Sequence, residues 1–277
     1  RILQFCKAEF QRVTQITAEA DASLPFESFV PRLRAEASSK YQGRKSLESA
    51  KALYVVVEKI LERNERLPLD WPVAGTSGYD FLVDVNSLFV ATQHEKFFNT
   101  IYEKFVGEKF SFEEMVYHCK RLIMKVSMSS ESHALGHQLD RISECQRWSH
   151  DFTLNGLTLA LREIVACFPV YRTSIVGERV DERDRVYIEQ AVARAKRRNP
   201  ADSTEIYDFI RDLLLQKGLE RASEKEKLLR ANFVGRFQQF TGPMMAKAVE
   251  DTAFYRYNRL VSLNEVGGDP SRFGLSV

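Results

Sequence analysis

The sequence predicts a mainly α-helical chain that also carries a few strands of a parallel β/α sheet. Residues 53–57 form a continuous β-branched and aromatic run, which is typical of a strand buried on both faces. Residues 71–74 form a second apolar run, which opens into a Gly-Thr-Ser-Gly turn where the backbone can approach a ligand closely. Apolar residues at helical spacing over most of the remaining chain predict the helices.

Carboxylates follow the predicted strands. The first run ends in Glu58, and a third apolar run at residues 243–246 leads through residues 247–249 into Glu250 and Asp251, with a strand expected over residues 244–249. In a β/α barrel the catalytic groups lie at the carboxyl ends of the strands, and glycoside chemistry requires such carboxylates with aromatic residues nearby. Two other interpretations remain open. Asp251 could cap an amphipathic helix, and a single glutamate at a strand end is often structural.

Helical periodicity dominates the middle of the chain. The predicted helical stretches are residues 97–105, 115–123, 152–165, 186–195, 206–215 and 228–240. Gly107, Pro169 and Gly218 are suitable stops, and Asp181 and Ser203 are suitable starts. Residues 1–52 are predicted to form two or three further helices.

Composition and charge exclude several classes of protein. The chain has 277 residues and a net charge of +2, so no polyanionic partner such as nucleic acid is expected. The four cysteines form no CxxC pair, and no secretory signal or apolar segment of membrane-spanning length is present. We therefore expect a cytoplasmic protein without a membrane partner. The oligomeric state is not predicted.

No metal or cofactor site is predicted. His133 and His137 are four residues apart and could share a helix face, but no third ligand accompanies them, so a solvent-facing pair is expected. The turn at residues 75–78 has no lysine after it and therefore does not match a phosphate-binding loop.

Several long segments resemble the maltooligosyltrehalose synthase family of the α-amylase superfamily. The matching segments are VVVEKIL at residues 55–61, LPLDWPVAGTSGYDFL at 67–82, VNSLFV at 85–90, SHDFTLNGLTLALREIVACFPVYRT at 149–173 and RFQQFTGPMMAKAVEDTAFYRYNRLVSLNEVGGDPSRFGLS at 236–276. They are long, of low degeneracy, and spread from about residue 53 to the end of the chain.

The resemblance implies a fold and a domain organisation. The expected fold is a helical domain inserted into part of a (β/α)8 glycosidase barrel, of which three strands are visible. Residues 53–90 would hold barrel strands five and six with the following helix, residues 91–240 the inserted helical domain, and residues 241–277 strand seven and an active-site loop. The placement of residues 1–52 is left open.

The resemblance also assigns roles to individual residues. Glu58 matches the general acid/base, and Asp251 matches the carboxylate that stabilises the oxocarbenium-like transition state. Substrate contacts are expected from Tyr79, Asp80, Lys247, Tyr255, Arg256 and Asn264, with Arg259 as a further polar contact.

The implied activity is an intramolecular transglucosylation that converts the reducing-end α-1,4 linkage of a maltooligosaccharide to an α,α-1,1 linkage. The family's nucleophilic aspartate lies in a Gly-x-Arg-x-Asp motif before the acid, and residues 1–52 contain no such motif. We therefore expect an internal piece of a larger isomerase that is inactive alone, with a shortened relative as the alternative reading. A noncatalytic glucan-binding module and an α-glucan hydrolase also remain open.

Overall fold

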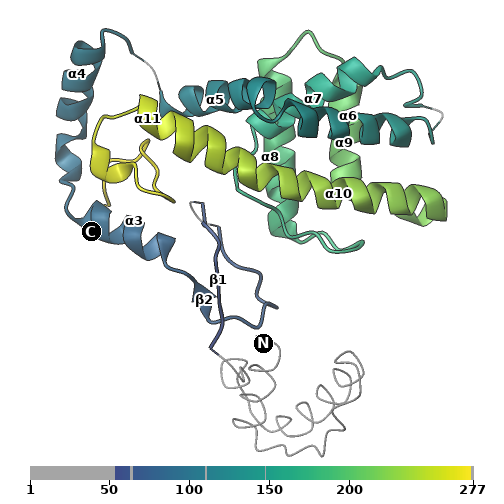
Figure 1. The fold of residues 1–277 in the computed structure, drawn as a ribbon, viewed down its shortest axis with the longest axis horizontal. Helices are drawn as coiled ribbons and strands as arrows, with labels where there is room; N and C mark the ends of the chain where they lie inside the picture. The colour runs from purple at the N-terminus through teal and green to yellow at the C-terminus, as the bar shows by residue number, and fades with distance from the viewer. Residues whose placement is uncertain (1–53, 63–64, 110, 147, 276–277) are drawn as a thin grey trace, which may run out of the picture. The chain divides into compact units, whose positions relative to one another are not determined.

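The computed structural model describes residues 54–62, 65–109, 111–146 and 148–275 (Figure 1). The helices predicted within residues 1–52 lie outside this range. The chain divides into two compact units, which are described separately below. The sheet unit comprises, among the described residues, 54–59 and 69–77. The helical unit comprises residues 60–68 and everything described from Gly78 onward.

The sheet unit contains the two predicted strands as a parallel pair. Strand β1 (Val56–Val57) pairs with β2 (Gly75–Thr76), with Val56 opposite Gly75. The pairing continues beyond both strands, because Ala74 N donates to Val55 O at 2.6 Å and Ser77 N donates to Val57 O at 3.0 Å. The expected burial on both faces is wrong for this run: Val55 and Val56 are each 42% exposed, since no second layer covers them among the described residues.

Each of the six stretches predicted from periodicity overlaps a helix of the helical unit, whereas the helix Ser129–Ser143 was not predicted. Its α-helices are α3 (Tyr79–Leu88), α4 (Glu95–Val106), α5 (Phe112–Val126), α6 (Ser129–Ser143), α7 (Leu154–Ala166), α8 (Glu182–Arg198), α9 (Thr204–Leu214), α10 (Glu224–Met245) and α11 (Phe254–Arg256). A π-helix, η4 (Ala246–Ala253), joins α10 to α11. Short 3-10 turns are η2 (Thr92–His94), η3 (Leu219–Arg221) and η5 (Val261–Leu263).

Local signals explain where these helices begin and end. The hydroxyls of Ser111, Thr153 and Ser223 each accept a hydrogen bond from the backbone N–H three residues later, which caps α5, α7 and α10. Gly107 ends α4 in the left-handed conformation at φ 80°, as predicted. Gly218 also has a positive φ of 73°, which glycine adopts without steric penalty.

The hydrophobic core of the helical unit lies around α7. This helix packs against α5, α6, α8 and α9, and α10 packs against α5, α6 and α9 (Figure 1). The backbones of α6 and α7 approach closely, since a Cβ at Gly136 would lie 2.2 Å from the Thr158 hydroxyl oxygen. The largest fully buried side chains are Tyr207, Phe209, Phe233, Phe237, Met124, Leu139, Ile142, Leu157, Leu161, Ile164, Ile188 and Ile210.

The prediction of a strand at residues 244–249 is wrong, because this segment is helical. Residues 244 and 245 end α10, and residues 246–249 belong to η4. The buried residues of α10 and η4 recur every three to four positions, from Phe233 and Phe237 through Met244 to Ala248. That spacing places one face of a helix against the core, so helical periodicity overrides the strand-like appearance of a short apolar run.

No helix among the described residues is both long and apolar enough to cross a membrane.

Candidate functional site

Glu58 lies at the carboxyl edge of the parallel strand pair. It follows the last residue of β1, and Ser77 follows the last residue of β2. Because the strands are parallel, both residues lie at the same edge, where β/α enzymes place their reactive groups. The Glu58 side chain is exposed. The strand-end position predicted for Glu58 is therefore confirmed, and its role stays a prediction.

Asp251 does not follow a strand. It lies within η4 and its side chain is exposed. The alternative interpretation, an N-capping aspartate, is also wrong, since Asp251 is inside a helical segment. Glu58 belongs to the sheet unit and Asp251 to the helical unit, so each is described within its own unit. The strand-end argument consequently supports Glu58 alone.

Glu250, the neighbour of Asp251, is partly buried. Its Oε1 accepts a short hydrogen bond from the Tyr171 hydroxyl. Burial raises the pKa of Tyr171 well above its usual range, and the Glu250 carboxylate raises it further, with smaller contributions from Glu62 and Tyr79. Tyr79, predicted as a substrate contact, is thus part of a cluster with Tyr171 and two carboxylates in the helical unit.

Lys120 lies beside this cluster and is almost fully buried, with 2% of its surface exposed. Its Nζ donates to Phe168 O at 2.8 Å. Burial lowers the pKa of Lys120 to about 8, and the Glu62 carboxylate acts in the opposite direction. A cleft of ≈ 240 Å³ is lined by Lys120 and Glu62 together with Asp269 and Ser271. The cleft brings a nearly buried cation together with the carboxylates of Glu62, Glu113 and Asp269.

Tyr117 and Arg198, which line this cleft, belong to a hydrogen-bonded network. The Tyr117 hydroxyl donates to Glu163 Oε2 at 2.6 Å, and Asn199 Nδ2 donates to the same oxygen at 3.0 Å. Burial and then Glu163 raise the pKa of Tyr117 to about 12. The Arg198 guanidinium stacks 4.0 Å from the centre of the Tyr117 ring. These partners hold the wall of the cleft rigid.

The loop after η5 completes the cleft, and its glycines are needed for close backbone approach. A Cβ at Gly268 would lie 2.5 Å from Leu263 O and 2.7 Å from Glu265 O. Gly267 has φ 81°, and a Cβ there would lie 3.1 Å from the Cβ of Tyr79. Side chains larger than hydrogen would displace this loop, which carries Asp269, from the start of α3.

The remaining predicted contacts divide into structural and accessible residues. Arg259 is buried: its Nη1 donates to Asn99 Oδ1 at 2.7 Å and its Nη2 to Pro270 O at 2.8 Å. Asn264 Nδ2 donates to the backbone carbonyls of Phe254 at 2.7 Å and Tyr257 at 2.5 Å. Both side chains fix the C-terminal segment, so the structure gives them a structural role.

The accessible group contains the other four predicted contacts. Tyr255 is 79% exposed, and the side chains of Lys247, Asp80 and Arg256 are also exposed. Arg256 lies near α5, where its Nη1 is 3.6 Å from Cys119 Sγ. Asp80 lies in the first turn of α3, where a carboxylate interacts favourably with the helix dipole.

Glu250, Tyr171, Lys120 and Glu62 were not predicted as site residues. One signal was available for Lys120: it lies four residues after Val116 and directly after Cys119, on the apolar side of its helix. For Glu250 and Tyr171, which are 79 positions apart, only the fold brings the two side chains together.

Metal ligation has no support among the described residues, where no group of three or more His, Cys, Asp or Glu side chains is placed to hold an ion. His133 and His137 both lie on α6 with exposed side chains, as predicted for a solvent-facing pair.

Comparisons with known proteins point to one enzyme. No family model matches the chain. A curated Mycobacterium tuberculosis protein (strain H37Rv), provisionally named a maltooligosyl trehalose synthase, is 29% identical over 80% of this chain and 26% of its own length. The maltooligosyltrehalose synthase structure from Arthrobacter ramosus matches with a TM-score of 0.64 and 32% identity, over 90% of this chain and 27% of that one.

A Sulfolobus tokodaii structure, described as a hypothetical maltooligosyl trehalose synthase, matches with a TM-score of 0.54 and 26% identity, over 90% of this chain and 27% of that one. The chain spans 26–27% of the length of these relatives. Over most of its own length, the chain therefore resembles part of a maltooligosyltrehalose synthase, which is the enzyme that the sequence and the structure comparisons both name.

Proposed function

We propose that this chain supplies part of an enzyme that converts the reducing-end α-1,4 linkage of a maltooligosaccharide into an α,α-1,1 linkage. The names of the similar proteins support this activity. The observation that carries the proposal within the chain is the position of Glu58, at the carboxyl edge of a parallel strand pair. A barrel glycosidase places its general acid at this end of its strands.

Glu58 would transfer protons in both halves of the reaction. Its carboxyl group protonates the glycosidic oxygen as the α-1,4 bond breaks, while the glucan is held on a nucleophilic carboxylate. The resulting Glu58 carboxylate then takes the proton from the anomeric hydroxyl of the released glucose. That hydroxyl attacks the glycosyl carbon and forms the α,α-1,1 bond. Water must be excluded between the two steps, because attack by water would give hydrolysis.

Asp251 would stabilise the developing positive charge on the reacting sugar. Sequence resemblance supports this role, and its exposed carboxylate is accessible to a ligand. Glu250, in contrast, is already the hydrogen-bond partner of Tyr171. The proposal therefore assigns catalysis to Asp251 and a positioning role to Glu250.

The test is Glu58→Gln in the complete protein that carries this sequence. The amide keeps the shape of the side chain but delivers no proton, so turnover should fall at least about a hundredfold while maltooligosaccharide binding survives. Turnover is measured as loss of reducing ends from maltopentaose. Glu108→Gln, at an exposed position, is the matched control.

Two outcomes would contradict the proposal. Near-normal turnover of Glu58→Gln would remove Glu58 from the chemistry. A gain of reducing ends by the unmodified protein would identify a hydrolase in place of the mutase.

A further inference from the structure

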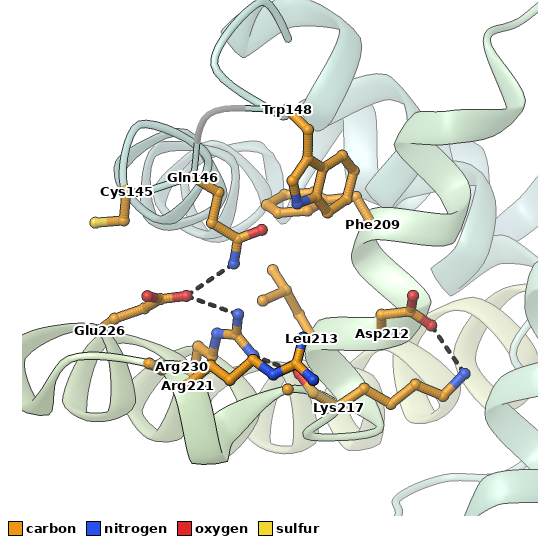
Figure 2. Close-up of a pocket in the computed structure, with 12 residues that line it drawn as sticks. Cys145, Gln146, Trp148, Phe209, Asp212, Leu213, Lys217, Arg221, Glu226 and Arg230 are labelled. Atoms are coloured by element: carbon orange, nitrogen blue, oxygen red, sulfur yellow. Dashed lines mark hydrogen bonds and ion pairs between the residues drawn. The ribbon is translucent and has the colours of Figure 1, made fainter.

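A second cleft of ≈ 440 Å³ lies between the loop after α6, the C-terminal end of α9 and the start of α10 (Figure 2). It shares no lining residue with the cleft around Lys120. No step of the proposed reaction uses its residues. Its composition is unusual for the surface of a helical bundle, because an exposed indole ring lies above a buried ion pair.

One wall of the cleft is aromatic. Trp148 is 59% exposed, although tryptophan is among the side chains that bury most of their surface in folded proteins. Its ring makes edge-to-face contacts with two other rings. The centroid of the Phe209 ring lies 5.6 Å away with an interplanar angle of 81°, and that of the Phe152 ring lies 6.1 Å away with an angle of 87°. These contacts fix the orientation of the indole while much of its surface stays accessible.

The floor of the cleft is polar and preorganised. Arg230 Nη2 donates to Glu226 Oε1 at 2.6 Å, and Gln146 Nε2 donates to the same oxygen at 2.7 Å. Arg230 Nη1 donates to Lys217 O at 2.7 Å. Figure 2 shows these side chains meeting beneath Trp148. The Gln146 amide is thereby fixed at the cleft, where its oxygen can accept a hydrogen bond.

Unused hydrogen-bonding capacity remains in the cleft. The buried Arg230 Nε has no hydrogen-bond partner among the residues that the structure describes. The charges nearly balance, since Lys217, Arg221 and Arg230 face Asp212 and Glu226. Lys217 Nζ is itself 3.0 Å from Asp212 Oδ1. A polyanion is therefore disfavoured, and the polar floor disfavours a wholly apolar ligand.

We propose that this cleft is a second glucan-binding site, in which Trp148 holds the face of one glucose ring of an α-1,4-glucan. A pyranose ring combines an apolar C–H face, which packs on an indole, with an edge of hydroxyl groups. Those hydroxyls are both donors and acceptors and so match Gln146, Asp212 and Arg221. The choice of an α-glucan rests on the proposed function, whereas the aromatic and polar design of the cleft does not.

The site is tested with maltoheptaose and the 277-residue chain. The sequence has two tryptophans, Trp71 and Trp148, so a ¹H–¹⁵N spectrum contains two indole cross-peaks that substitution of Trp71 assigns. Maltoheptaose should shift the Trp148 cross-peak in a saturable manner. In the Trp71→Phe variant it should also protect the remaining tryptophan from acrylamide quenching. Absence of both effects at millimolar sugar would overturn the proposal.

Substitution of Trp148 provides the second test of the site. Trp148→Ala should raise the Kd for maltoheptaose about tenfold or more, as expected when a central aromatic contact is lost. Phe105→Ala removes an aromatic ring that is more exposed than Trp148, at 88% against 59%, and should leave the titration of the Trp148 indole unchanged. Because Trp148 also contacts two other rings, Trp148→Tyr is included as a variant that keeps an aromatic surface, and it should bind with intermediate affinity.

Other results would contradict the site. An unchanged Kd with Trp148→Ala would show that the sugar binds elsewhere. Equal affinity for cellohexaose, a β-1,4-glucan, would overturn the assignment to an α-glucan.

The proposed function can fail separately from this site. If Glu58→Gln keeps full turnover while maltoheptaose still shifts the Trp148 cross-peak, the catalytic proposal fails and the proposed glucan-binding site is retained. If turnover falls but the cross-peak does not respond, only the cleft is overturned.

Discussion

Helices α4 and α10 have similar apolar periodicity but very different surroundings. In α4, Phe97, Ile101 and Phe105 follow one another at four-residue spacing and are 63%, 50% and 88% exposed. In α10, Phe233 and Phe237 have the same spacing and are fully buried. The contrast shows that periodicity establishes a helix and its apolar stripe, whereas burial depends on which other element reaches that stripe.

Helix α4 is held through a neighbouring face. Its Tyr102 hydroxyl accepts from Asn258 N at 3.0 Å, and its Phe98 ring lies 5.1 Å from that of Phe273. Arg259 joins the same segment to Asn99. The helix is therefore fixed by contacts with the C-terminal loop, while its most apolar stripe contributes little buried area among the described residues.

The largest effect should come from truncating the buried core. We expect Phe237→Ala to lower the free energy of unfolding by about 3–5 kcal/mol, because it removes a fully buried ring and leaves a cavity. Urea unfolding followed by circular dichroism measures this change. A loss below about 1 kcal/mol would contradict the packing described for α10.

A smaller effect should follow from the ionisation of Lys120. The pKa of Lys120 is about 8 in the folded state, below the ordinary lysine value of 10.5, so the unfolded state binds more protons between these two pH values. Burial of the charged lysine therefore destabilises the fold below pH 8, and stability recovers as pH rises toward 10.5. Relative to Lys120→Met, the unmodified chain should gain about 2 kcal/mol between pH 7 and 9.5.

Unfolding of both proteins at the two pH values measures this difference, and comparison with Lys120→Met cancels the titration of the tyrosines and cysteines common to both. An identical pH dependence of the two proteins would show that Lys120 is not buried as a cation.

The smallest effect should come from the exposed stripe of α4. We expect Phe105→Ser to change the free energy of unfolding by no more than about 0.5 kcal/mol, since the ring is already in solvent. It should also reduce the binding of the dye ANS, which reports exposed apolar surface. A loss of stability comparable to that of Phe237→Ala would show that a second element covers this face, and the comparison between the two helices would fail.

The candidate site was predicted in part. Glu58 was identified correctly as a strand-end carboxylate because a short β-branched run and its terminus are local features. The strand predicted before Asp251 was wrong because a short run with five apolar residues in six fits either a strand or one side of a helix. The longer pattern of buried residues that starts at Phe233 has helical spacing and therefore indicates a helix. Arg259 and Asn264 were expected to contact substrate, but their partners are distant backbone and side-chain groups that a sequence does not reveal.

The sequence by itself determined six of the helices, the stop at Gly107 and the two strands, because each depends on residues close together in the chain. Only the tertiary structure decided which groups act together. It joined Tyr171 to Glu250, buried Lys120 beside Glu62, and placed Trp148 in the same cleft as the ion pair between Glu226 and Arg230. These arrangements depend on how the helices pack, and packing is set by contacts between residues far apart in sequence.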